Sequence, residues 1–175
     1  LHKSSHSFPT RRSSDLGYDV VTAMAPGPDR AHYMPQAKSI LMKLVADNKT
    51  GRLLGVQAVG PGDGAKRIDV AATAISGGMT LDDVANLDLS YAPPYAPAMD
   101  NLITAANVAR NKRAGHMIGI SAEDVYAKMQ NSDDFVFLDV RSPQEHAEVR
   151  LPKAVLIPLG ALRKRLSELP KDKEI

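Results

Sequence analysis

The chain has 175 residues, of which 43% are hydrophobic and 24% charged, a composition typical of one globular domain or two small ones. It contains no cysteine, which excludes disulfides, thiolate metal sites and a thiol nucleophile within this chain. No apolar run approaches the roughly 18 residues of a membrane span. The formal net charge of +2 by itself would favour an anionic partner.

The first sixteen residues account for that charge. LHKSSHSFPTRRSSDL has no apolar core, so it is not a secretory signal. Its last ten residues match the translation of a common short-read sequencing adapter, and we interpret residues 1–16 as an artefact that should be disordered. They hold three of the 22 basic and one of the 20 acidic residues, so 19 of each remain. The rest of the chain is neutral and predicts neither a nucleic-acid nor a membrane partner.

Residues 17–114 begin with a pattern that predicts an antiparallel sheet. Apolar residues at alternate positions predict a strand over 18–25 and a hairpin whose arms, 38–47 and 52–60, flank the turn NKTG. Residues 26–37 are rich in proline and glycine and are expected to form an irregular crossing.

Helices should cover one side of this sheet. Residues 64–78 have apolar side chains at helical spacing and end in a glycine pair. Thr80 and Asp83 resemble a capping box for a short helix, and 98–113 predicts another helix with basic residues in its last turn. The predicted fold is therefore an α+β layer. The apolar residues of the first helix are Ile68, Ala71, Ala72 and Ile75.

From residue 115 on, strands and helices alternate, which is the signature of a parallel sheet. About sixty residues is short for such a sheet, so 115–175 predicts an incomplete α/β half-domain, loosely packed at its open edge. The expected elements are a helix over 122–130 capped by Ser121, a strand over 135–140, a helix over 142–149, a strand over 154–158 and a helix over 159–169 with leucines on one face.

Two short motifs have simple structural interpretations. GPGDGA, residues 60–65, has the outline of a dinucleotide fingerprint, with Asp82 and Asp83 about twenty residues later. Its strand is already paired in the hairpin and no parallel strand follows, so we interpret it as a glycine turn. NKT at 48–50 fits a glycosylation acceptor, but without an export signal it is better explained as the hairpin turn.

The charged and imidazole side chains indicate no metal site. His32, His116 and His146 lack the spacing of metal ligands. Asp139 and Arg141 follow a predicted strand, where they would serve either a site at the end of that strand or a structural ion pair.

Residues 91–100, YAPPYAPAMD, carry two tyrosines on a stiff irregular frame, because their three prolines exclude both a helix and a central strand. Tyr33 lies in a second proline-bounded segment, AHYMP. A tyrosine of a small domain is usually partly buried with a hydrogen-bonded hydroxyl. The placement of Tyr33, Tyr91 and Tyr95 favours a functional role, since a phenol near pH 7 can donate a hydrogen bond or proton to a developing anion.

The combination of KRIDV (66–70), YAPPY (91–95) and AMDN (98–101) at these separations resembles the C-terminal dimerisation domain of the coenzyme A-disulfide reductases. These are FAD-dependent enzymes of the pyridine nucleotide-disulfide oxidoreductase superfamily, and the resemblance covers 17 to about 113. It implies a homodimer, FAD bound mainly by an N-terminal domain outside this sequence, NAD(P)H as reductant and coenzyme A as substrate.

The same resemblance implies roles for the tyrosines. Tyr33 and Tyr91 match residues that reach in trans toward the redox cysteine and coenzyme A sulfur of the partner subunit. Two O–H donors there would stabilise the thiolate expelled when the mixed disulfide is reduced. Pro93, Pro94 and Tyr95 would lie near the flavin of the partner, or Tyr95 would instead pack against protein.

Residues from about 119 on resemble the start of a rhodanese domain, with Asp139 and Arg141 as structural residues. The sequence departs from that pattern at Arg150 and Lys153, where many rhodaneses have His and Gly. It stops before the loop that begins with the sulfur-carrying cysteine, which implies an N-terminal half without sulfurtransferase chemistry. A reductase joined to a rhodanese resembles the coenzyme A persulfide and polysulfide reductases.

The sequence therefore predicts a fragment of a cytoplasmic FAD-dependent oxidoreductase that uses NAD(P)H to reduce coenzyme A disulfide, persulfide or polysulfide, and that is inactive alone. Two alternatives stay open: a non-catalytic dimer-forming module with a rhodanese-like appendage, and an NADH oxidase or peroxidase of the same superfamily. The choices between NADH and NADPH and among the sulfur acceptors also stay open.

Overall fold

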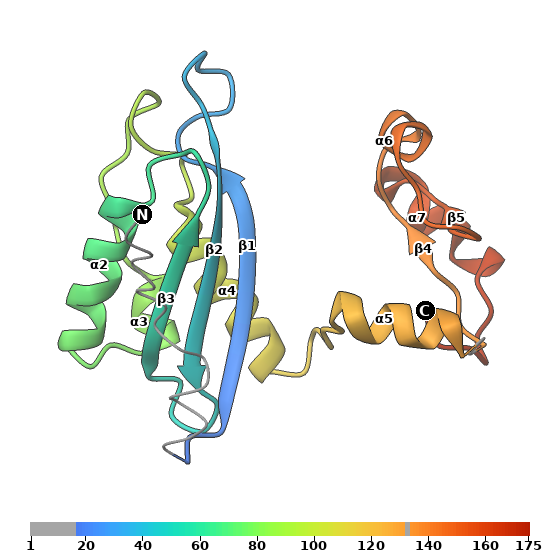
Figure 1. Ribbon diagram of the computed structural model, residues 1–175, viewed down its shortest axis with the longest axis horizontal. Helices are drawn as coiled ribbons and strands as arrows, with labels where there is room; N and C mark the ends of the chain where they lie inside the picture. Colours follow the sequence, from blue (N-terminus) through green and yellow to red (C-terminus); the bar gives the residue numbers. More distant parts are fainter. Residues whose placement is uncertain (1–16, 132–133) are drawn as a thin grey trace, which may run out of the picture. The chain divides into compact units, whose positions relative to one another are not determined.

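The computed structural model describes residues 17–131 and 134–175, which belong to two compact units that divide between Gly119 and Ile120 (Figure 1). The adapter-like segment, residues 1–16, lies outside the described residues. The boundary expected at 114/115 falls in the segment between the last helix of the first unit and this division.

The first unit is built on a three-stranded antiparallel sheet of β1 (Val20–Pro28), β2 (Ser39–Asp47) and β3 (Leu53–Val59), in the order β1-β2-β3. The predicted hairpin joins β2 to β3. In its turn, the carboxylate of Asp47 accepts hydrogen bonds from the backbone N–H groups of Lys49 and Thr50 and from the Thr50 hydroxyl. Residues 48–50 are thus a hairpin turn, as interpreted from the sequence.

β1 is an edge strand and runs three residues further than predicted. Lys112 donates to the carbonyl oxygen of Thr22 (2.9 Å), so the even-numbered residues of β1 direct their backbone groups away from β2. Pro26 and Pro28 occupy such outward positions, where the missing N–H costs no bond of the ladder. The assignment of residues 26–28 to an irregular crossing was wrong for this reason.

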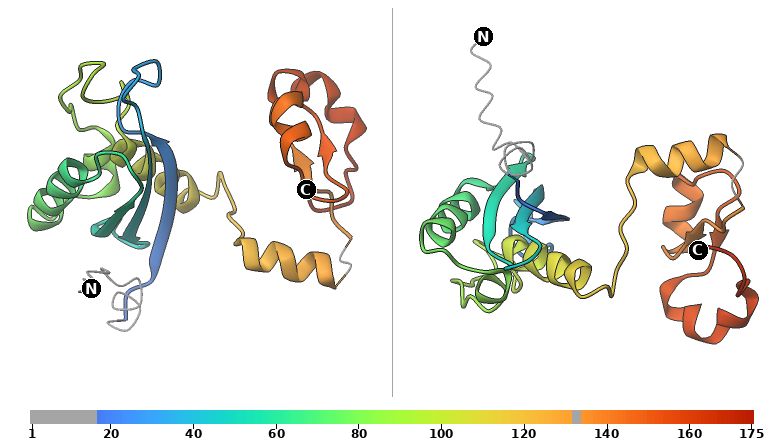
Figure 2. Two further views of the ribbon diagram at one scale, coloured as in Figure 1. Left: turned by 45° about the horizontal axis from the view of Figure 1, so that its top comes forward. Right: turned by 90° about the horizontal axis from the view of Figure 1, so that it is seen from below.

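Three helices lie on one side of the sheet, where α2 and α4 contact the strands and α3 packs against α4, which confirms the predicted α+β layer (Figure 2). They are α2 (Ala65–Ser76), α3 (Leu81–Ala85) and α4 (Asn101–Arg113). α3 has the predicted capping box, in which Thr80 and Asp83 exchange side chain-to-backbone bonds. α4 begins three residues later than predicted, because the carboxylate of Asp100 caps it by accepting from the N–H of Leu102 (3.0 Å).

The core of this unit lies between the sheet and the helices. β2 buries Ile40, Met42, Leu44 and Ala46, in agreement with its alternating sequence. The facing helices contribute mainly small side chains, which let the helices approach the sheet closely. These are Ala71, Ala74, Ala105, Ala106 and Ala109.

The buried face of α2 is rotated from the predicted one. Ala72 is exposed, whereas Arg67 is buried with Ala71 and Ala74 at positions i, i+4 and i+7. Ile68 and Ile75 pack at the border of the core. The buried face of α2 thus includes a charged residue, Arg67, which the apolar periodicity of the sequence did not predict to be buried.

The second unit alternates helices and strands as expected. Its parallel pair confirms the predicted topology, with Leu138 opposite Val155 and Asp139 opposite Leu156. The predicted strand over 135–140 is shorter than expected, and Phe135 instead forms an isolated parallel bridge with Glu174. The elements are α5 (Ala122–Gln130), β4 (Leu138–Asp139), α6 (Pro143–Glu148), β5 (Val155–Leu156), α7 (Leu159–Arg165) and the 3-10 helix η1 (Leu166–Glu168).

This unit buries few apolar side chains. Ile157 is the single fully buried hydrophobic residue in its described part, and the predicted leucine face of the last helix leaves Leu159 and Leu166 exposed. Local caps are well formed nonetheless: Ser121 caps α5, and Ser142 and Glu145 form a capping box at α6.

We expect the substitution Lys153→Gly to stabilise the second unit by about 1 kcal/mol, because Lys153 has a left-handed φ of 64° that disfavours side chains with a Cβ. Urea unfolding followed by NMR signals of this unit measures the change. Lys164→Gly, in the exposed last turn of α7, is the matched control and should destabilise the unit by up to about 1 kcal/mol. Destabilisation by both substitutions would contradict the assignment of strain to residue 153.

Candidate functional site

The segments that carry the candidate tyrosines lie side by side at one end of the sheet (Figure 1). Tyr33 is in the connection between β1 and β2, and Tyr91 and Tyr95 are in the connection between α3 and α4. The backbone N–H of Ala31 donates to the carbonyl oxygen of Pro93 (3.1 Å), which joins the two connections directly. Tyr33 and the pair Tyr91 and Tyr95, about sixty residues apart in the sequence, therefore belong to neighbouring loops at the same end of the sheet.

The three phenol rings are exposed, while the backbone beneath them is held in place. Tyr33 is 64% exposed, Tyr91 54% and Tyr95 73%. The N–H groups of Tyr95 and Ala96 both donate to the carbonyl oxygen of Ala92 (2.9 and 3.0 Å), and Ala96 is buried. The turn over 92–96 is irregular, as the prolines predicted, and it directs the ring of Tyr95 outward.

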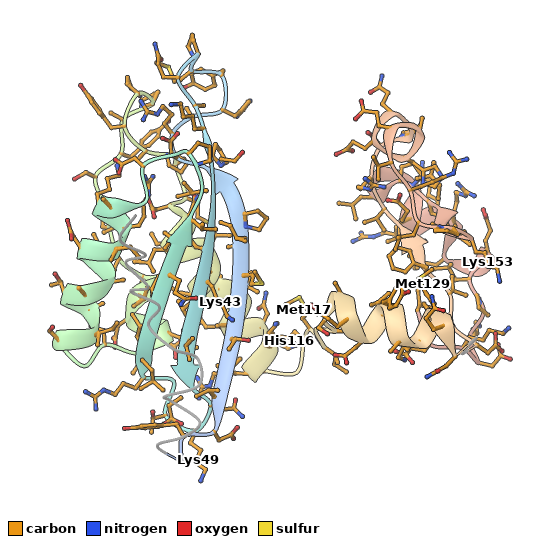
Figure 3. The ribbon with its side chains drawn as sticks, viewed as in Figure 1. Lys43, Lys49, His116, Met117, Met129 and Lys153 are labelled. Carbon is orange, nitrogen blue, oxygen red and sulfur yellow. The ribbon has the colours of Figure 1, made fainter. Side chains whose placement is uncertain are left out.

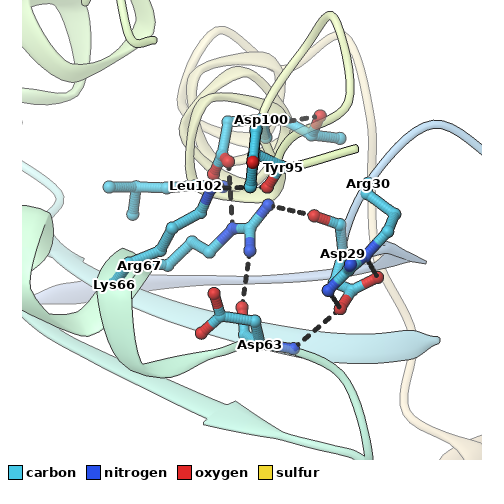
Figure 4. Close-up of polar contacts among 9 residues, drawn as sticks. Asp29, Arg30, Asp63, Lys66, Arg67, Tyr95, Asp100 and Leu102 are labelled. Atoms are coloured by element: carbon cyan, nitrogen blue, oxygen red, sulfur yellow. Dashed lines mark hydrogen bonds and ion pairs between the residues drawn. The ribbon is translucent and has the colours of Figure 1, made fainter. Parts of the chain in front are cut away.

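A buried guanidinium lies beneath this end of the sheet (Figure 4). Arg67 of α2 is only 1% exposed. Its Nε donates to a carboxylate oxygen of Asp100 (2.9 Å), its Nη1 to the carbonyl oxygen of Asp63 (2.5 Å) and its Nη2 to that of Asp29 (2.6 Å). One side chain thus connects the end of β1, the loop before α2 and the N-terminus of α4.

The carboxylate of Asp29 forms a second set of bonds in the same cluster. It accepts from the guanidinium of Arg30 (3.1 and 3.0 Å) and from the backbone N–H groups of Lys38 and Asp63 (3.0 Å each). The Arg30 side chain and these N–H donors hold the pKa of Asp29 well below its ordinary value, against the opposing effect of burial. The carboxylate therefore stays charged throughout the neutral range.

The glycine segment 60–65 is a turn, as interpreted from the sequence. The N–H of Gly62 donates to the carbonyl oxygen of Ser39 (3.3 Å), and a Cβ at Gly62 would lie 2.7 Å from the carbonyl oxygen of Lys38. The N–H of Asp63 is bonded to Asp29. Glycine here allows close packing against β2, and these two N–H groups are bound to protein acceptors instead of being available to a phosphate.

Sequence reasoning missed Arg67, Asp29 and Asp100 as members of the site. A signal was present, because Arg67 lies four residues before Ala71 on the same helical face. A cation in the first turn of a helix is also disfavoured by the helix dipole, so its presence indicates a specific acceptor.

In the second unit, Asp139 and Arg141 form the ion pair that was one of their two interpretations. Arg141 donates from Nε and Nη2 to the two oxygens of the buried Asp139 (3.0 and 2.8 Å), and its Nη2 also reaches the carbonyl oxygen of Val149 (2.6 Å). His146, which the sequence did not connect to this pair, lies with Nδ1 2.8 Å from Asp139. Hydrogen bonds from the Arg141 side chain, and to a lesser extent from His146, keep the pKa of Asp139 well below its ordinary value. This geometry favours the structural interpretation.

Within residues 17–131 and 134–175, no three His, Asp or Glu side chains converge in a way that would hold a metal ion. Over the same part of the chain, no helix combines the length and apolar character needed to cross a bilayer.

Comparison with known proteins identifies the family to which this chain belongs. Residues 11–103 match the pyridine nucleotide-disulphide oxidoreductase dimerisation domain, and residues 121–175 match the rhodanese-like domain. The first match covers more than half of the chain, which therefore belongs to the pyridine nucleotide-disulphide oxidoreductase family. Both resemblances found in the sequence are confirmed.

Relatives with about half of the aligned residues identical are named as coenzyme A-dependent sulfur or persulfide reductases, and a relative with 34% identity over 93 residues is the NADH oxidase of Methanocaldococcus jannaschii. The chain is 51% identical over 92 residues to the NAD(P)H sulfur oxidoreductase (CoA-dependent) of Pyrococcus furiosus, covering 53% of this chain and 21% of that protein. Over 92 residues it is 50% identical to the NAD(P)H coenzyme A polysulfide/persulfide reductase of Pyrococcus horikoshii, covering 53% and 20%. The chain thus spans about a fifth of the length of these curated relatives.

A solved structure matches across both units. The NAD-dependent persulfide reductase from A. fulgidus aligns with a TM-score of 0.83 and 49% identity, covering 95% of this chain and 29% of that one. The order of a dimerisation domain followed by a rhodanese-like domain is therefore shared with this protein.

We expect Arg67→Met to lower the free energy of unfolding of the first unit by about 3–5 kcal/mol, because it leaves the buried carboxylate of Asp100 without its cation. Urea unfolding measures the loss. Arg52→Met, at an exposed position, is the control and should change stability by less than about 0.5 kcal/mol. A loss below about 1 kcal/mol in Arg67→Met would contradict a central role for this side chain.

The lowered pKa of Asp29 also predicts a pH dependence. Its stabilising contribution is complete above the ordinary aspartate pKa of about 4 and is lost as the pH falls toward the lower value in the folded state. The unfolding free energy should therefore decrease between about pH 4 and pH 2. Asp29→Asn should be less stable at neutral pH and show a weaker decrease. Identical pH profiles for the original chain and Asp29→Asn would refute this assignment.

Proposed function

We propose that this chain is the dimerisation and rhodanese-like part of an FAD-dependent oxidoreductase that uses NAD(P)H to reduce coenzyme A persulfide, polysulfide or disulfide. Within it, Tyr33 and Tyr91 serve the active site of the partner subunit in a homodimer. The observation that carries the proposal is the pair of exposed phenols on loops joined by the bond from Ala31 to Pro93, in a domain whose family role is dimerisation.

The chemistry suits a phenol. Two-electron reduction of a sulfur–sulfur bond expels a thiolate, and FAD bound elsewhere in the protein would supply the electrons received from NAD(P)H. An O–H group of Tyr33 or Tyr91 directed at the departing sulfur donates a hydrogen bond to its developing negative charge. Because the rings project from backbone that is already hydrogen-bonded, little reorganisation is needed to present them.

The remaining assignments from the sequence belong to the same proposal. Pro93, Pro94 and Tyr95 border the exposed end of the turn and would lie near the flavin of the partner. The pair Asp139–Arg141 would have a structural role in the rhodanese-like unit. A cytoplasmic location agrees with NAD(P)H and coenzyme A as reactants.

Two features support a sulfur reductase over the alternatives. The relatives with about half of the aligned residues identical are named for coenzyme A-dependent sulfur, polysulfide or persulfide reduction. The persulfide reductase from A. fulgidus shares both units. A rhodanese-like unit beside the dimerisation domain is consistent with persulfide sulfur as the oxidant, whereas an NADH oxidase has no need of one.

In the intact enzyme, Tyr33→Phe and Tyr91→Phe should each lower kcat for sulfur reduction by on the order of 10²-fold if the donor bond to sulfur is direct. KM for NAD(P)H should stay unchanged, since the nicotinamide is not bound by these rings. Steady-state kinetics with coenzyme A persulfide measures both constants. Tyr126→Phe, an equally exposed ring in α5, is the matched control. Unchanged kcat in both active-site variants would sink the proposed role and favour the oxidase or the non-catalytic module.

Mixed dimers test whether the tyrosines act in trans. One subunit carries Tyr33→Phe and Tyr91→Phe, and the other lacks the redox cysteine of its flavin domain. If the tyrosines serve the partner, the mixed dimer contains one complete active site and recovers about half of the activity, although each parent homodimer is impaired. Absence of recovery would show that the tyrosines act within their own subunit.

A further inference from the structure

We infer that Lys66 is a positioning residue for the turn that carries Tyr91 and Tyr95. The ammonium of Lys66 donates to the carbonyl oxygen of Tyr95 (2.6 Å), across 29 residues of sequence (Figure 4). This bond connects the first turn of α2 to the middle of the 91–100 segment. The neighbouring Arg67 also binds this segment, through Asp100 at the C-terminal end of residues 91–100.

This bond explains why a lysine is found in the first turn of α2. The first turn of α2 has no acidic residue and instead has two successive cations, Lys66 and Arg67. The dipole of a helix disfavours positive charge at its N-terminus. Both cations are directed at oxygen acceptors of other segments, so the sequence retains them for tertiary contacts at some cost to the helix itself.

The two cations hold different parts of the 91–100 segment, one in the interior and one at the surface. Arg67 is buried and fixes the base of the segment at Asp100, while the turn over 92–96 lies at the surface and buries only Ala96. The bond between Ala31 and Pro93 ties this exposed turn to the connection between β1 and β2, whereas the bond from Lys66 ties it to the helical layer. The carbonyl that Lys66 binds belongs to Tyr95, so the bond restrains the backbone of the segment that carries Tyr91 and Tyr95.

This inference rests on the proposed function for its catalytic consequence, but the positioning can be measured in the chain by itself. In Lys66→Met, the amides of Tyr95 and Ala96 should exchange with solvent about tenfold faster, because a bond with a charged donor is lost. The amides of Leu44 and Ala46 in the core should keep their rates. Lys66→Arg should restore slow exchange, since it keeps the charged donor.

The urea midpoint of Lys66→Met should change little, because relief of the unfavourable positive charge in the first turn of α2 offsets the loss of one exposed hydrogen bond. Lys49→Met is the matched control: Lys49 is an exposed lysine in the turn between β2 and β3, at the other end of the sheet (Figure 3). It should leave the exchange of Tyr95 and Ala96 as it was. Unchanged exchange at these two amides in Lys66→Met, or no restoration by Lys66→Arg, would overturn the inference.

The intact enzyme separates this inference from the proposed function. There, Lys66→Met should lower kcat for sulfur reduction several-fold with KM for NAD(P)H unchanged, and Lys66→Arg should recover it. Faster exchange without any change in kcat would overturn the catalytic part of the inference. Full activity of Tyr33→Phe and Tyr91→Phe would instead refute the proposed function, whatever the exchange rates of the lysine variants.

Discussion

The structure of the first unit depends on one buried cation. The guanidinium of Arg67 is almost completely removed from solvent, and its three bonds go to three segments that are distant in the sequence. A guanidinium has several donors in a rigid plane, so it can satisfy a carboxylate and two carbonyl oxygens at once, which an ammonium cannot do in the same geometry. Burial of such a charge is tolerated only when it is fully paired, and this requirement determines where β1, α2 and α4 meet.

The same arrangement explains how exposed side chains can be held in a defined place. The rings of Tyr33, Tyr91 and Tyr95 contribute little to the core, yet the backbone that carries them is bonded to Arg67 through its flanks and to Lys66 in the turn. Polar contacts of the helical layer therefore help to fix this end of the sheet. Under the proposed function this end meets a second subunit, and fixed loops would present their rings without a large ordering cost on association.

The second unit is organised differently. Its described part buries Ile157 and little other apolar surface, and its order depends more on caps and on the ion pair of Asp139 with Arg141 and His146. Lys153 adds local strain to this unit, since its left-handed φ of 64° disfavours a residue with a side chain. Local polar structure of this kind is sufficient to define the β4–β5 pair, but it leaves leucines of α7 exposed.

The sequence by itself determined the α+β layer, the hairpin at 48–50, the capping box of Thr80 and Asp83 and both family resemblances, because these features depend on periodicity, turn chemistry and motifs that are local in the chain. It also marked Tyr33, Tyr91 and Tyr95 as unusual, since proline stiffness is a local property. Only the tertiary structure decided that Arg67, and not Ala72, faces the core, and that Lys66 binds the carbonyl oxygen of Tyr95. Those contacts join residues about thirty positions apart, and the sequence pattern of one helix contains no record of which distant oxygen its cations will meet.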